Sequence, residues 1–290
     1  MAQVTLIGTK GGPSLRETGP SFMPSASHLA FGDLSIIVDC GLGVTAGMVR
    51  AGFPLTGLSH IFLTHYHSDH CLELGGLVHT AWTAGLAHRI KIFGPPGLDE
   101  LWGGFRRMMA FDIALRQSDE GRPPLDDLVE LHIYGDGADG PVTICDDGQL
   151  CVTALRNLHP PIHDSFALRF DHSGKAVTFS GDTAYLPPLA AFARGSDVLV
   201  HEAMLAAGLD YVLGNTRTSD DRLRAHLLRA HSFAAEAARV AAAANVGHLL
   251  LNHLIPPERG VCDDALWLAE VAGHFTGPCS VGHDGMAVFF

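Results

Sequence analysis

The chain has 290 residues, of which 47% are hydrophobic and 17% are charged, so it can bury a sizeable core and disorder is not expected. Its formal charge of −12 reflects 19 basic and 31 acidic residues, a balance that disfavours a general binder of polyanions. It has no apolar run of roughly 18 residues, no leader pattern and no CxxC pair, so a reduced, cytoplasmic location is expected.

Short β-branched runs alternate with helical patterns along the first half of the chain. In chain order, the predicted elements are strands at 4–7, 28–31 and 35–39, a helix at 44–52, a strand at 61–64, a helix at about 71–85, a strand at 90–93 and mostly helical residues at 98–117. Residues 119–127 are predicted to be a loop.

The second half repeats this alternation without a repeat in sequence. The predicted elements are strands at 129–134, 150–155, 166–170 and 176–180, a short helix at 186–193, a strand at 198–201, a polar and irregular segment at 206–230, a helix at 233–244, a strand at 248–251, a helix at 263–273 and a strand at 286–290. Ser232 is the expected N-cap of the helix at 233–244. Strands that alternate with helices predict α/β layers around one or two sheets.

The densest cluster of ligand-type side chains lies in "HIFLTHYHSDHCLE", directly after an apolar run. His65 and His67 are two apart on an extended segment, so both side chains can meet one ion. Asp69 and His70 follow the turn and can reach a second ion. Imidazole nitrogen together with carboxylate oxygen suits zinc, and also manganese or iron. The alternative interpretation is a polar turn with solvated histidines.

Three further candidate ligands each follow an apolar strand. His159 follows "LCVTALRNL", Asp182 follows "AVTFSG" and His253 follows "HLLLN". Each of them alone is more often an ordinary strand-end residue. Taken together with the upstream motif, they favour a site for two metal ions.

The motifs "THYHSDH", "SGDT", "HEAM" and "LNHL" resemble those of the metallo-β-lactamase-fold hydrolases, in particular the branch of ribonuclease Z and the arylsulfatase-like enzymes. The segments "GTKGGP" and "GPPG" also resemble that branch, and the motifs follow in the same order over nearly the whole chain. The resemblance implies an α/β fold, a four-layer αβ/βα sandwich, with the metals at the open edge of two packed sheets. It also implies a single hydrolase domain over residues 1–290.

The resemblance further implies two divalent cofactor ions, with zinc expected and manganese or iron compatible. Its first-metal ligands would be His65, His67 and His159; its second-metal ligands would be Asp69, His70 and His253; and Asp182 would bridge the two ions. The nucleophile would be a water or hydroxide held between the ions.

Four other positions have expected supporting roles. Glu202 and His231 resemble a pair that acts near the leaving group, with Glu202 orienting a His231 ring that donates a proton. Asp69 is expected to be a catalytic residue as well as a metal ligand. Asp39 and Thr64 are expected to contact the ligand histidines on the side away from the metal, where Asp39 can accept a hydrogen bond from a ligand ring. The alternative is that Glu202 caps a strand, His231 enters a helix and Asp39 forms a turn.

The substrate is predicted to be a small molecule with a sulfate ester, phosphodiester, lactone or related activated bond. Only 22 residues separate His159 from Asp182, too few for the long tRNA-binding arm that ribonuclease Z carries there, so long nucleic acid is disfavoured. The alternatives are a ribonuclease Z-like endonuclease and a non-catalytic metal-binding module. Residues 206–230 could form a lid with an arginine on an anionic group, or a solvated helix face. No membrane partner is expected, and a homodimer is compatible with the sequence.

Overall fold

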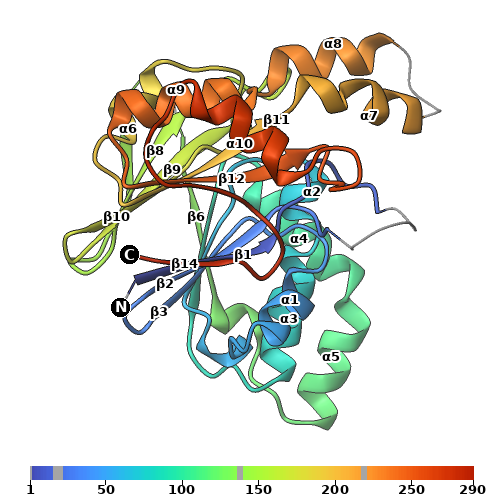
Figure 1. Cartoon of the computed structure of the whole chain (residues 1–290). Helices are drawn as coiled ribbons and strands as arrows, with labels where there is room; N and C mark the ends of the chain where they lie inside the picture. The colour runs from blue at the N-terminus through green and yellow to red at the C-terminus, as the bar shows by residue number, and fades with distance from the viewer. Residues whose placement is uncertain (1, 16–21, 136–139, 217–220) are drawn as a thin grey trace.

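The computed structural model describes residues 2–15, 22–135, 140–216 and 221–290. Two seven-stranded sheets pack face to face, and helices cover the outer side of each, which confirms the predicted four-layer sandwich (Figure 1). The first sheet has the order β14-β1-β2-β3-β4-β5-β6, and the second has the order β13-β12-β11-β10-β9-β8-β7. Among these residues, no helix is long and apolar enough to cross a membrane.

Each sheet has an antiparallel half and a parallel half. The antiparallel halves are β14-β1-β2-β3 and β10-β9-β8-β7, and the parallel halves are β3-β4-β5-β6 and β13-β12-β11-β10. The first sheet contains β1 (Ala2–Gly8), β2 (Ala26–Phe31), β3 (Leu34–Val38), β4 (His60–Phe62), β5 (Ile90–Gly94), β6 (Val129–Ile133) and β14 (Ala287–Phe289). The second contains β7 (Val142–Asp146), β8 (Cys151–Arg156), β9 (Phe166–His172), β10 (Lys175–Phe179), β11 (Val198–Met204), β12 (His248–Ile255) and β13 (Cys279–Val281). Parallel strands place their carboxyl ends at one edge, where loops can converge on a site.

The helices divide between the two outer faces. Those on the first sheet's side are α1 (Val44–Arg50), α2 (Ser68–Cys71), α3 (Leu74–Thr83), α4 (Leu98–Met108) and α5 (Ala110–Asp119). The second sheet's side has α6 (Pro188–Phe192), α9 (Ala234–Ala244) and α10 (Asp264–Ala272), while α7 (Leu209–Asn215) and α8 (Asp221–Ala230) project beyond it (Figure 1). Single 3-10 turns lie at η1 (Leu55–Gly57), η2 (Leu125–Leu128) and η3 (Ala206–Gly208).

A layer of aromatic rings fills the space between the sheets. Phe62 stacks on Phe93 with ring centroids 4.5 Å apart, and Phe170 of the opposite sheet meets Phe62 edge-on at 5.0 Å. All three rings are buried, and burying one such ring contributes about 1.5–3 kcal/mol. This packing fixes β4, and therefore the start of the histidine-rich segment that follows it.

Several predicted elements require correction. The described residues of the segment at 206–230 are mostly helical, because they include α7 and α8. The apolar residues of these helices pack on Met204 and Ile255, a contact that the many charged neighbours hide in sequence. The helix predicted at 71–85 is broken into α2 and α3. Strands β7 and β13, which form the two edges of the second sheet, were not predicted.

The predicted N-cap of α9 is also wrong. Phe233 occupies that position, and its amide donates to the Glu236 carboxylate at 2.9 Å. The Ser232 hydroxyl instead donates to the Thr183 carbonyl, which joins the start of α9 to the loop after β10. The alanine-rich face of α9 then packs closely on β11 and β12.

Candidate metal centre

All seven predicted ligands lie together at one edge of the sandwich, contributed by both sheets. The segment after β4 provides His65, His67, Asp69 and His70; the loops after β8 and β10 provide His159 and Asp182; and β12 provides His253. Thr64 marks the crossing between the sheets, because its carbonyl accepts the amide of Phe166 on β9 at 3.2 Å. Strand β4 ends at Phe62 and does not extend to Thr64, where the sequence predicted its end.

The first ligand group consists of three imidazoles and one carboxylate. His67 Nδ1 lies 3.1 Å from His65 Nε2 and 3.0 Å from His159 Nε2. Two nitrogens on one tetrahedral zinc ion lie about 3.3 Å apart, given zinc–nitrogen bonds of about 2.0–2.1 Å. Asp182 Oδ2 is 3.8 Å from both His65 Nε2 and His159 Nε2. The group therefore has the size of a single metal site.

The second ligand group shares Asp182 with the first. His70 Nε2 lies 3.3 Å from Asp182 Oδ1 and 3.7 Å from Asp69 Oδ2. His253 Nε2 lies 3.1 Å from Asp182 Oδ2 and 3.3 Å from Asp69 Oδ2. All four side chains are buried, so this group concentrates carboxylate charge away from water.

His253 enters the site because of a β-bulge. On β12, Asn252 pairs with Glu202 and Leu254 pairs with Ala203, which leaves His253 as the extra residue. Its φ of 44° lies in the left-handed region, which is uncommon for a residue other than glycine. The sequence placed His253 after a strand ending at 251, whereas β12 continues to Ile255 and the bulge turns this one side chain toward the metal group.

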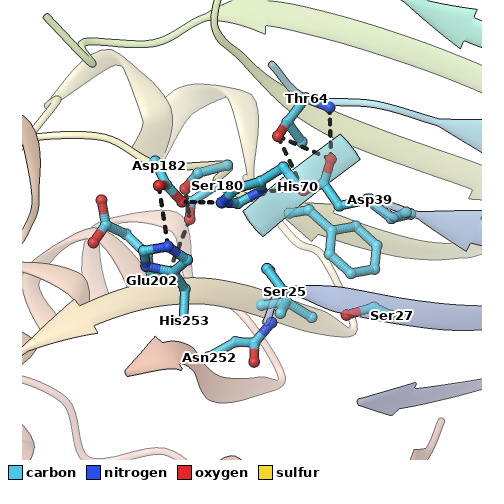
Figure 2. Close-up of a pocket in the computed structure, with 14 residues that line it drawn as sticks. Ser25, Ser27, Asp39, Thr64, His70, Ser180, Asp182, Glu202, Asn252 and His253 are labelled. Carbon is cyan, nitrogen blue, oxygen red and sulfur yellow. Dashed lines mark hydrogen bonds and ion pairs between the residues drawn. The ribbon is translucent and has the colours of Figure 1, made fainter. Parts of the chain in front are cut away.

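The orientation of the ligand rings is set by hydrogen bonds on their far sides. His70 Nδ1 donates to Asp39 Oδ2 at 2.8 Å, and the Thr64 amide and hydroxyl also donate to Asp39. His65 Nδ1 lies 3.1 Å from the Thr64 hydroxyl. Figure 2 shows the ring of His70 between Asp39 and Asp182. The Nε2 atoms of His65 and His70 are therefore left with lone pairs that face the site.

A cation would satisfy ligand atoms that the protein itself leaves without a hydrogen bond. Among the described residues, His70 Nε2 and Asp182 Oδ1 are buried with no hydrogen-bond partner. Burial lowers the pKa of His65 and lowers that of His159 to about 4, so both are neutral as metal ligation requires. Burial also lowers the pKa of His70, but Asp182, Asp39 and Asp69 raise it well above its usual value. A divalent cation can replace the proton that these carboxylates attract, so the residues fit two divalent ions.

Glu202 and His231 form a buried pair beside the metal group. His231 Nδ1 lies 3.0 Å from Glu202 Oε2 and 3.1 Å from Oε1, and the Thr183 amide donates to the same carboxylate. Burial would lower the pKa of His231, but the Glu202 carboxylate raises it to about 9. The ring of His231 stacks on that of His253 at 5.4 Å, and its Nε2 is left to face the cavity described below. This is the arrangement of an oriented proton donor.

Backbone groups that the sequence did not reveal also hold the ligands. The Gly12 amide, in "GTKGGP", donates to Asp69 Oδ2 at 2.8 Å. A β-carbon at Gly11 would lie 2.5 Å from Ile255 and 3.0 Å from the His253 ring, so only glycine fits there. His159 Nδ1 donates to the carbonyl of Ala230 at the end of α8, at 2.9 Å. The glycine-rich motif was the one sequence signal for these contacts.

A cavity of about 370 Å³ opens from the metal group beneath α7 and α8. The helices thus cover the site as the lid hypothesis expected, but their arginines do not reach it. Arg224 pairs with Asp210 at the surface, Arg222 and Arg229 are exposed, and Arg217 lies outside the described residues. His226 of α8 faces the cavity instead, and sequence reasoning did not single it out.

A third group of ligand-type side chains lies at the other end of β4. His60, Cys145 and Asp147 have one ligand atom each within 4.8 Å of one another. The Lys91 ammonium is 3.9 Å from Asp147 Oδ2, and Asp147 Oδ1 accepts the amides of residues 149 and 150. Positive charge and hydrogen bonds already satisfy this carboxylate, so the group does not make a second metal centre.

The chain is similar in sequence to a known protein family and to several known proteins. A family model described as the anti-Pycsar protein Apyc1 matches residues 8–231. The chain is 33% identical to a ribonuclease Z of Mycobacterium sp. (strain KMS), over 98% of this chain and 94% of the relative. It is 31% identical to the ribonuclease Z of Mycobacterium marinum (strain ATCC BAA-535 / M), over 98% and 97% of the two chains.

Two solved structures have a similar fold. The short form of human tRNase Z superposes with a TM-score of 0.71 at 21% identity, over 99% of this chain and 98% of that one. The metallo-β-lactamase-fold protein YhfI of Bacillus subtilis superposes with a TM-score of 0.69 at 24% identity, over 99% and 98% of the two chains. At these sequence identities the similarity shows a shared fold and nothing beyond it.

Proposed function

Because the chain belongs to the metallo-β-lactamase-fold hydrolases, in the family of ribonuclease Z and Apyc1, we propose that it is a metal-dependent phosphodiesterase acting on a ribonucleotide substrate. The observation that carries the proposal is the Glu202–His231 pair beside the two ligand groups. A proton donor at that position serves an oxygen leaving group, and the ribonuclease name of the relatives favours a phosphodiester over a sulfate ester, lactone or other activated ester.

The proposed ligand assignment follows the two groups. His65, His67 and His159 would hold one cation, Asp69, His70 and His253 would hold the other, and Asp182, which belongs to both groups, would contribute to both. Zinc suits this set of imidazole and carboxylate donors best, and manganese or iron are compatible. When bound, the two cations supply a nucleophile from water at neutral pH and neutralise charge on the phosphoryl group.

The protein's own residues position the metal ligands and protonate the leaving group. Gly12 fixes the Asp69 carboxylate, and Asp39 and Thr64 fix the ligand rings, so the centre is already in place before substrate binds. Glu202 holds His231 with its Nε2 toward the cavity, ready to donate a proton to the departing oxygen. The Glu202 carboxylate raises the pKa of His231 to about 9, and cations held at the centre would lower it toward the neutral range in which a general acid works.

A second candidate, hydrolysis of a small phosphodiester and not of a long RNA, is favoured by a specific structural feature. Strands β9 and β10 are joined directly through Ser173 and Gly174, both with positive φ, so no arm extends between His159 and Asp182. The net charge of −12 also opposes long-range attraction of RNA.

Metal analysis combined with a substrate panel tests the proposal. The panel contains bis-p-nitrophenyl phosphate, p-nitrophenyl sulfate, p-nitrophenyl acetate, a homoserine lactone, a short RNA and a precursor tRNA with a 3′ trailer. We expect about two metals per chain, turnover of the phosphodiesters, and loss of turnover in His67→Ala but not in His163→Ala, whose side chain is 82% exposed. Turnover of the sulfate, acetate or lactone alone would contradict the phosphodiester assignment, and bound metal without any turnover would favour a non-catalytic module.

A further inference from the structure

The cavity beside the metal group has mainly apolar walls. The apolar residues that line it opposite the metal ligands are Val212 of α7, Leu223 and Leu227 of α8, Ile255 at the end of β12, and Pro256. Its volume of about 370 Å³ is in the lower part of the range for small-molecule sites, roughly 300–1,000 Å³. The cavity therefore suits a compact organic group that sits beside a metal-bound anion.

His226 is a polar residue on the otherwise apolar inner face of α8. Leu223, His226, Leu227 and Ala230 follow the helical i, i+3, i+4, i+7 spacing, and Leu227 and Ala230 are buried. The outer face of the same helix carries exposed arginines. Among the described residues, no group hydrogen-bonds the ring of His226. A half-buried imidazole without a protein partner is suited to meet a ligand.

The distances place His226 just outside the ligand shell. The rings of His65, His67 and His159 have centroids 4.9 Å apart in each pair. The centroid of His226 is 6.3 Å from that of His67, 6.0 Å from that of His159 and 5.8 Å from that of His231. A group bound to the first metal position and in reach of His231 is therefore also in reach of His226.

We propose that His226 is a substrate-binding residue, and that the cavity takes the nucleoside unit of a small phosphodiester whose non-bridging oxygen accepts a hydrogen bond from the His226 ring. This inference rests on the proposed phosphodiesterase function. The apolar walls of α7 and α8 enclose the base and sugar, while His231 faces the leaving group. The helices that project from the sandwich thereby define the size of the substrate (Figure 1).

The test compares four proteins: the wild type, His226→Ala, His226→Gln and the control Arg229→Ala. Arg229 lies on the exposed side of α8, so its removal leaves the cavity intact. Each metal-loaded protein is assayed with the p-nitrophenyl ester of uridine 5′-monophosphate, and binding of uridine 5′-monophosphate is measured by calorimetry. Metal content and melting temperature are recorded for every variant.

We expect His226→Ala to raise both KM and the Kd for uridine 5′-monophosphate about 10- to 100-fold, as loss of a charge-assisted hydrogen bond does, with a smaller effect on kcat. His226→Gln, which keeps a donor, should recover part of that loss, and Arg229→Ala should match the wild type. Metal content and melting temperature should stay unchanged in all variants.

Three results would overturn the inference: wild-type protein that does not bind the nucleotide, a His226→Ala variant that binds it like Arg229→Ala, or loss of metal in His226→Ala. A wild type that binds the nucleotide through His226 but hydrolyses no phosphodiester would instead refute the proposed function and support the binding site.

Discussion

At the scale of single residues, the centre depends on side chains whose protonation the fold sets. Glu202 keeps a proton on His231, while burial keeps His65 and His159 neutral and able to ligate a cation. The same type of side chain is therefore suited to act as acid or as ligand, because the Glu202 carboxylate outweighs the effect of burial at His231, whereas burial prevails at His65 and His159.

The proposed role of His231 as a proton donor predicts a dependence on the leaving group. His231→Ala should lower kcat about 10²- to 10⁴-fold for a substrate whose leaving group is a ribose hydroxyl. The same change should have little effect on a p-nitrophenyl ester, because p-nitrophenolate departs without needing a proton. Steady-state kinetics on the two substrates check this. Equal losses on both would indicate that His231 positions the substrate or the metals and does not protonate the leaving group.

Buried neutral histidines away from the site predict acid lability. Burial lowers the pKa of His28 to about 4, and its ring stacks on Phe53 at 3.7 Å. Between its folded pKa of about 4 and its unfolded value of about 6.5, the unfolded chain binds the extra proton, so stability falls as pH decreases through this range. Protonation linked to His28 alone should lower the free energy of unfolding by about 2 kcal/mol when the pH falls from 7.5 to 5.

Denaturant unfolding at the two pH values measures this cost. The drop in the free energy of unfolding should be smaller by about 2 kcal/mol in His28→Asn than in the wild type. His163→Asn is the control, since its exposed side chain should leave the pH dependence unchanged. An identical drop in all three proteins would assign the acid lability to other groups.

At the scale of elements, short segments with dense backbone contacts hold the ligands. The Cys40 amide donates to the His70 carbonyl, and the Glu73 amide donates to the Cys40 carbonyl at 2.9 Å, so α2 is fixed to the turn after β3. The Glu73 carboxylate in turn accepts amides at the start of α1. The four-residue α2 is too short to be stable alone and depends on these contacts.

Gly41, within that turn, is predicted to be intolerant of a side chain. A β-carbon there would lie 2.4 Å from the Asp69 carbonyl oxygen and 2.7 Å from that of Ser25, so α2 would have to move. Gly41→Ala should lower stability by about 1–3 kcal/mol and weaken metal binding at the second group. Thermal unfolding and competition with a chelator measure the two effects. Gly273→Ala, with open space around it, is the control and should change neither.

At the scale of the whole molecule, the metal centre joins the two sheets. His159 and His67 lie 92 residues apart in sequence, and His253 and Asp69 lie 184 apart, yet each pair meets within 3.3 Å. Three buried carboxylates, Asp39, Asp69 and Asp182, converge there, and their mutual repulsion opposes packing of the sheet edges unless positive charge is present.

Metal removal is therefore expected to destabilise the whole fold. An ion present at 100 times its Kd contributes about 2.7 kcal/mol, which for a chain of this size corresponds to roughly 4–5 °C in melting temperature. Calorimetry before and after chelation, with zinc then added back, measures this shift. In Asp182→Asn the shift should be much smaller, because the bridging carboxylate is lost. An unchanged melting temperature in the wild type after complete metal removal would contradict the role of the centre in joining the sheets.

The sequence by itself determined the local features of this protein. The order His65-x-His67-x-Asp69-His70 after an apolar strand, and the strand-end positions of His159 and Asp182, follow from residue spacing, because neighbours along the chain constrain one another directly. Most strands and helices were predictable for the same reason, since their apolar periodicity is a local property.

Only the tertiary structure decided which distant groups complete the site. The bulge that turns His253 inward, the Gly12 amide on Asp69 and the placement of His226 over the cavity all arise from contacts between segments far apart in sequence. Helices α7 and α8 were hidden because their apolar stripe is recognisable only against the surface of Met204 and Ile255 that it covers. The fold, and not the local pattern, places a histidine where the sequence suggested an arginine.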